Sequence, residues 1–110
     1  KAIACGEEKA IIRMAAALCF LREDKTLEVD KILSDIPTLH DCHAHYLYLV
    51  LKLHSATRKK DLAIMKSLKE QISGLQVENA GLEKAVVALC EGNFTLALTY
   101  ETDALLKLAA

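Results

Sequence analysis

The sequence predicts an all-α protein built from three antiparallel helical hairpins. Its 110 residues include one Pro and four Gly, and 53% of them are hydrophobic, a composition typical of a packed helical domain. Apolar side chains recur at steps of three and four residues along most of the chain, which is the period of one helix face. Polar turns at Asp24, Lys60 and Gly92 are 36 and 32 residues apart, so the helices fall into similar pairs.

These turns divide a single domain, residues 1–110, into units at about 7–37, 38–74 and 75–110. A chain of this length buries roughly two thirds of its unfolded surface in one core. One hairpin cannot bury its own apolar face, so we expect the units to stack on one another.

The first unit begins with a helix over residues 7–22, whose apolar side chains cover a wide stripe. Thr26 is the expected N-cap of the second helix, because a threonine hydroxyl can accept a hydrogen bond from the backbone at a helix start. Pro37 ends that helix, since proline disfavours helical geometry at Ile36.

The second unit begins with the most apolar helix of the chain, expected over residues 39–58. Thr38 and Asp41 form a variant of the capping box at its start. Tyr46 to Leu51 are continuously apolar or aromatic, and a helix that is apolar on nearly all sides has to be covered on several of them. We therefore expect this helix at the centre of the fold.

Residues 62–89 have two interpretations. In the first, a helix follows the turn at Lys59, Lys60 and Asp61 and ends at Ser73 and Gly74. In the second, near-heptad spacing of Leu and Ile makes the whole stretch one long coiled-coil helix. Gly74 and Gly81 would each cost about 1 kcal/mol inside a helix, which favours a break near residue 74.

The third unit consists of two apolar-faced helices on either side of Gly92 and Asn93, residue types that tolerate positive φ and so permit a tight reversal. This unit resembles the second half of a tetratricopeptide (TPR) repeat, and the mean spacing of the turns equals the 34-residue TPR period. The residues that match the TPR pattern are Ala85, Gly92, Phe94, Ala97 and Ala104.

The resemblance implies a TPR-like right-handed superhelix of stacked hairpins. Some positions depart from the TPR pattern. Glu101 stands where the family has an aromatic residue, and Leu53 and Met65 replace small residues in the middle unit. These departures leave the exact superhelix open.

No residue constellation predicts catalysis or a cofactor. Glu101 and Asp103 are two residues apart and point to different helix faces, and no glycine-rich phosphate loop occurs. Cys19 and Cys90 are expected to be reduced core residues. We therefore predict a protein that is not an enzyme and has no catalytic residue.

The cluster of His and Cys at residues 40–45 contains metal-ligand types, but a tetrahedral zinc site needs ligands from a second segment. None is evident, so no metal is predicted.

The charge pattern excludes two classes of partner. The net charge of −1 directs the chain neither to nucleic acid nor to an anionic membrane. No apolar run reaches about 18 residues, so no membrane span is predicted, and a cytoplasmic location follows as the simplest expectation. The middle unit is basic and the final unit acidic, a pattern that can orient an oppositely charged partner.

In TPR folds the first helix of each pair lines the concave side, and an amphipathic helix of a partner fits such a groove. Internal core is the alternative for any one of these positions. Carrying the pattern over gives this groove: Ile11, Met14, Leu18, Leu21, Leu47, Val50, His54, Leu82, Val86 and Leu89.

Among short TPR proteins, the chain looks similar to the cytoplasmic type III secretion chaperones that hold the needle subunit. The similarity lies in its size, its three units, an early Gly6-Glu7-Glu8 and the stretch 82–109. It implies a hetero-oligomer with one or two small helical proteins, the needle subunit and a co-chaperone. Two alternatives remain: a fragment of a larger helical scaffold, and a self-associating coiled-coil protein.

Overall fold

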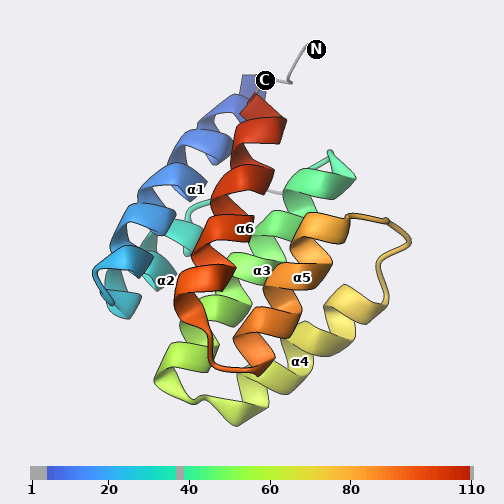
Figure 1. The fold of residues 1–110 in the computed structure, drawn as a ribbon. Coiled ribbons are helices and arrows are strands. Elements are labelled where there is room, and N and C mark those ends of the chain that lie inside the picture. The colour runs from blue at the N-terminus through green and yellow to red at the C-terminus, as the bar shows by residue number, and fades with distance from the viewer. Residues whose placement is uncertain (1–4, 37–38, 110) are drawn as a thin grey trace.

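The computed structural model describes residues 5–36 and 39–109. All regular structure in these residues is helical (Figure 1), as the composition predicts. The six described helices are α1 (Cys5–Arg22), α2 (Thr26–Ser34), α3 (Cys42–Lys59), α4 (Leu62–Ser73), α5 (Ala80–Cys90) and α6 (Phe94–Ala109).

The helices pair as hairpins, α1 with α2, α3 with α4 and α5 with α6, and this pairing confirms the sequence prediction. Each hairpin turns through one residue of positive φ: Asp24 at 58°, Lys60 at 60° and Gly92 at 76°. In each turn that residue bonds back three positions and the next residue bonds back five, the hydrogen-bond pattern of a Schellman motif. The three polar breaks in the sequence are therefore three copies of one turn.

Helix α3 is the centre of the molecule, as its apolar sequence predicts. It packs against all five other described helices. Leu47, Val50, Leu51 and Leu53 are fully buried along it. This helix supplies the largest share of the buried core.

The third hairpin closes back on the first. Helix α6 lies against α1 and α3 as well as its partner α5 (Figure 1). Among the described helices, the backbone of α4 comes close only to α3 and does not pack closely on α5. A linear stack would pack each hairpin only against its sequence neighbours, so the TPR-like superhelix is not confirmed.

The predicted starts of two helices are wrong. Thr26 begins α2 without capping it, and the cap residue Lys25 offers no side-chain bond. Asp41 itself caps α3, accepting from the backbone nitrogens of His43 and Ala44 at 2.9 and 3.1 Å. The prediction that Thr38 opens this helix, like the role of Pro37, lies outside the described residues.

Residues 62–89 do not form one helix. Helix α4 ends at Ser73, and residues 75–79 have no helical structure. Asn79 then starts α5 by accepting from the backbone nitrogen of Leu82 at 3.1 Å. The continuous coiled-coil interpretation is therefore wrong, and the break near Gly74 is confirmed.

Cys19 and Cys90 are exposed, which corrects their assignment to the core. Each follows a buried leucine, Leu18 or Leu89, that belongs to the inward stripe. One residue further along a helix is a rotation of about 100°, so the predicted stripes were one position too wide. None of the described helices is long and apolar enough to cross a membrane.

Candidate functional site

The ten residues of the predicted groove are brought together by the fold, but mostly as core. Met14, Leu21, Leu47, Val50, His54 and Leu82 are 0% exposed, and Leu18 and Leu89 are 3% and 2% exposed. Only Ile11 and Val86 are partly accessible. In the single chain the other eight side chains are already buried in the core, so a partner helix cannot lie on them unless the core opens.

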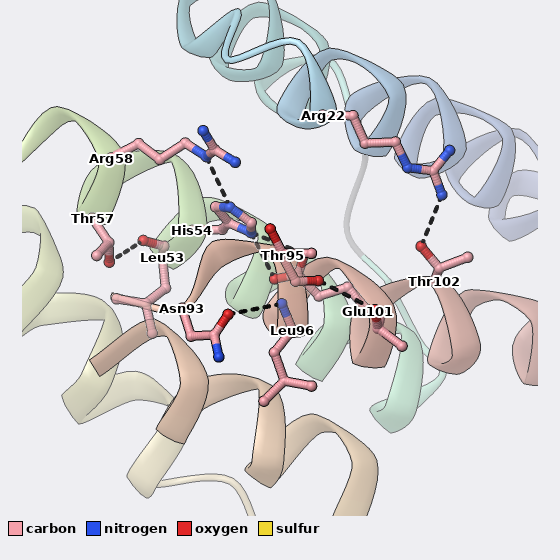
Figure 2. A network of polar contacts seen from close by, with 11 residues as sticks. Arg22, Leu53, His54, Thr57, Arg58, Asn93, Thr95, Leu96, Glu101 and Thr102 are labelled. Atoms are coloured by element: carbon pink, nitrogen blue, oxygen red, sulfur yellow. Dashed lines mark hydrogen bonds and ion pairs between the residues drawn. The ribbon is translucent and has the colours of Figure 1, made fainter. Parts of the chain in front are cut away.

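The buried residues His54 of α3 and Glu101 of α6 are the centre of a polar network between these two helices (Figure 2). Nδ1 of His54 lies 3.0 Å from both carboxylate oxygens of Glu101, and both side chains are 0% exposed. Arg58 Nε donates to His54 Nε2 at 3.0 Å. Because Nε2 accepts that bond, the proton of a neutral imidazole resides on Nδ1, which donates it to Glu101.

Aromatic packing and a second carboxylate complete this network. The ring of Phe94 stacks on His54 with centroids 5.3 Å apart, and the Arg58 guanidinium lies 4.6 Å from the same ring centroid. Arg58 also donates to Asp24 in the first hairpin turn at 3.1 Å. The network therefore links the turn after α1 to α3 and α6.

Burial raises the pKa of Glu101, while the hydrogen bond from His54 and the electrostatic attraction of His54 and Arg58 act in the opposite direction. Desolvation penalises a charged carboxylate, and a donor or a cation beside it favours that charge. With both partners fully buried, no substrate reaches the pair. Its geometry holds α6 on α3 and offers no site for acid–base chemistry on a ligand.

The sequence contained a signal for this pair that our prediction missed. Glu101 falls four residues after Ala97 and three before Ala104, and both alanines are buried. A carboxylate in phase with a buried stripe needs a buried partner. We predicted His54 as a groove residue and Glu101 only as a departure from the TPR pattern, and did not predict that they pair. The prediction that Glu101 and Asp103 face different ways is confirmed, because Glu101 is buried and Asp103 is exposed.

In the cluster at residues 40–45, the side chains of His43 and His45 contact different neighbours. His43 Nδ1 lies 3.2 Å from Asn79 Nδ2, and the His45 ring stacks on Tyr48 with centroids 6.3 Å apart. Within residues 5–36 and 39–109, no three His, Cys, Asp or Glu side chains are placed to hold a metal ion.

The outer surface of α5 and α6 carries an open hollow of about 350 Å³. The fully buried Ala85 and Ala97 let these two helices approach closely. Val87 and Leu96 are 56% and 38% exposed beside it. We call this surface the α5–α6 groove, and its lining is Glu83, Lys84, Val87, Ala88, Glu91, Leu96 and Tyr100.

Acidic groups flank the apolar residues of the α5–α6 groove. Glu83 and Val87 on α5 and its C-cap residue Glu91 follow one another at steps of four, so they share one face. Both glutamates are exposed, and Lys84 is the only cation in the lining. An apolar centre with an acidic rim fits an amphipathic helix whose polar face is basic.

A larger hollow of about 490 Å³ lies between α1 and α6. Three threonines and Arg22 form much of its lining, and Arg22 already donates to Thr102 at 3.2 Å. This hollow therefore offers fewer apolar anchors than the α5–α6 groove.

Comparison with protein-family models, curated proteins and solved structures finds no match to this chain. The resemblance to TPR proteins and to needle-subunit chaperones accordingly stays a prediction from the residues.

Proposed function

We propose that this chain is a non-enzymatic protein-binding module, and that it holds a basic amphipathic helix of a partner in the α5–α6 groove. The observation that carries the proposal is that exposed Val87 and Leu96 and half-buried Tyr100 line one hollow together with Glu83 and Glu91. An apolar hollow with a polar rim is a frequent property of sites that bind protein helices. The proposal moves the binding surface from the buried residues of the predicted groove to the outer side of the third hairpin.

The finer identity of the partner rests on the resemblance alone. If the chain is a TPR-like type III secretion chaperone, the partner helix belongs to a needle subunit, and the chain sequesters it in the cytoplasm together with a co-chaperone. Burial of the partner's apolar face would prevent its premature polymerisation.

A binding experiment with two synthetic peptides tests the proposed groove. Both peptides carry leucines at helical spacing. One has lysines on its polar face and its twin has glutamates. We expect the lysine peptide to bind and to shift the amide resonances of Val87, Leu96 and Tyr100, and the glutamate twin to bind about tenfold more weakly or worse, a difference of about 1.4 kcal/mol.

The substitution Val87→Glu removes the central anchor and adds a third carboxylate beside Glu83 and Glu91. We expect it to weaken lysine-peptide binding by about tenfold or more. Ile12→Glu is the matched control, because Ile12 is 65% exposed on α1, away from the groove. Unchanged affinity in Val87→Glu, or resonance shifts outside α5 and α6, would contradict the proposal.

A further inference from the structure

Helix α4 has the least covered surface of the described helices. It packs only on α3, and Leu62 and Ile64 are 73% and 43% exposed. One side of it, which we call the α4 flank, borders an open hollow and consists of Leu62, Met65, Lys66, Lys69, Glu70 and Ser73. Most of these residues are three or four positions apart, the spacing of helix-in-groove anchors.

The structure lacks a contact that hairpin stacking would supply. In a stack, the second helix of one pair packs on the first helix of the next. Here α6 joins α1 and α3, residues 75–79 separate α4 from α5, and the backbones of α4 and α5 do not come close enough to pack as a pair. Each of these helices has an exposed apolar side chain, Leu62 on α4 and Val87 on α5.

The charges of the two surfaces are complementary. Lys66 and Lys69 lie on the α4 flank, whereas Glu83 and Glu91 lie on the rim of the α5–α6 groove. In the part of the chain that the structure describes, none of these four groups belongs to an ion pair. Opposite charges steer two surfaces together and disfavour pairing of each surface with itself.

We infer that the helix held in the α5–α6 groove is α4 of a second copy of this chain, an inference that rests on the proposed function. Leu62 and Met65 enter the apolar hollow beside Val87, Leu96 and Tyr100, and the two lysines meet the glutamates of the rim. The contact is heterologous, because the two copies use different surfaces. Each association leaves one α4 flank and one groove free, so copies join head to tail.

The test measures the mass of the full chain by sedimentation velocity from micromolar to millimolar concentration. We expect the average mass of the wild-type chain to rise with concentration. The variant Lys66→Glu/Lys69→Glu places an acidic flank against an acidic groove, and Glu83→Lys/Glu91→Lys places a basic flank against a basic groove. Each variant alone is expected to associate about tenfold more weakly or worse.

An equimolar mixture of the two variants provides the decisive arm. The acidic flank of Lys66→Glu/Lys69→Glu is complementary to the basic groove of Glu83→Lys/Glu91→Lys. The unchanged basic flank of the latter is likewise complementary to the unchanged acidic groove of the former. The mixture is expected to regain association close to that of the wild type. The control variant Lys9→Glu/Lys31→Glu changes the net charge by the same amount as Lys66→Glu/Lys69→Glu, but at exposed lysines of α1 and α2. It should associate like the wild type.

A wild-type chain that stays monomeric throughout would overturn the inference, as would charge-reversed variants that associate like the wild type or a mixture that does not recover. The peptide experiment separates this failure from that of the proposed function. If the chain is monomeric but the lysine peptide still binds at Val87, only the second copy is rejected as the occupant. If the peptide does not bind there, the groove itself is rejected.

Discussion

At the scale of single residues, the contact that most distinguishes this fold is the buried pair of His54 and Glu101. A carboxylate with no exposure is tolerated only with a donor in place, and His54 supplies it through Nδ1 at 3.0 Å. Arg58 determines which imidazole nitrogen carries the proton by donating to the other one. The fold thus has to bring His54 and Arg58 of α3 together with Glu101 of α6.

The raised pKa of Glu101 predicts a pH dependence of stability. Its folded-state pKa lies above the ordinary value of 4.5, chiefly because of burial, so between these values the folded chain binds more protons than the unfolded chain. The contribution of Glu101 to the free energy of unfolding is fully present below about pH 4.5 and is lost as pH rises through the folded-state pKa, by at most about 1.4 kcal/mol per pH unit.

Urea denaturation of the wild type and of Glu101→Gln over a pH series measures this contribution. Glutamine keeps the shape and the acceptor oxygen but does not ionise. We expect the wild type to lose stability relative to the variant as pH rises above about 4.5. Asp103→Asn, an exposed neighbour on α6, is the control and should show little change. A difference between wild type and Glu101→Gln that is constant with pH would refute the prediction.

At the scale of elements, the three hairpin turns use one hydrogen-bond pattern with different residues at the left-handed position. Gly92 adopts its φ of 76° without steric cost, but Lys60 has a side chain at a φ of 60°. A side chain in this conformation costs about 1–2 kcal/mol. The same turn is therefore relaxed in the third hairpin and strained in the second.

Reciprocal substitutions test this difference. Gly92→Ala is expected to lower the free energy of unfolding by about 1 kcal/mol, because a Cβ is introduced at positive φ. This loss of stability comes from the backbone conformation and not from a steric clash, since a Cβ added at Gly92 would meet nothing within 4 Å. Lys60→Gly should leave stability unchanged or raise it by up to about 1 kcal/mol. Equal losses in both variants, measured by denaturant titration, would contradict this account of the turns.

At the scale of the whole molecule, the described helices differ in how extensively they pack against the rest of the fold. Helix α3 contacts five helices and α6 contacts three, whereas α4 contacts one. Leu68 is the buried residue of α4, while α3 has ten. The free energy that opposes local opening follows the number of buried contacts, so α4 is the least firmly held helix of those described.

Native-state hydrogen exchange in dilute solution measures this ranking directly. The amides of α4 are expected to exchange through local opening at a lower free energy than those of α3 and α6. Ligand-free, dilute conditions matter, because occupation of the α4 flank by a second copy would add protection. Exchange of α4 only through global unfolding would show that it is held as firmly as the core.

How much of the fold was predictable depends on how local its causes are. Apolar periodicity and turn residues within short windows predict the helical secondary structure, the pairing of helices into three hairpins and the central position of α3. Helix starts were less accurate, since Thr26 and Asp41 compete with near neighbours for the cap position. For the eight buried residues of the predicted groove, the sequence left two interpretations open, internal core and binding groove. An apolar stripe has the same sequence pattern in both cases.

By itself, the sequence determined the secondary structure of this protein and the places where the chain reverses, because both depend on residues a few positions apart. Only the tertiary structure decided that α6 closes on α1, that His54 meets Glu101, that Cys19 and Cys90 face outward, and that Val87 is exposed between two glutamates. These features depend on the rotation of each helix against partners distant in sequence. Such packing results from many weak contacts that no local pattern records.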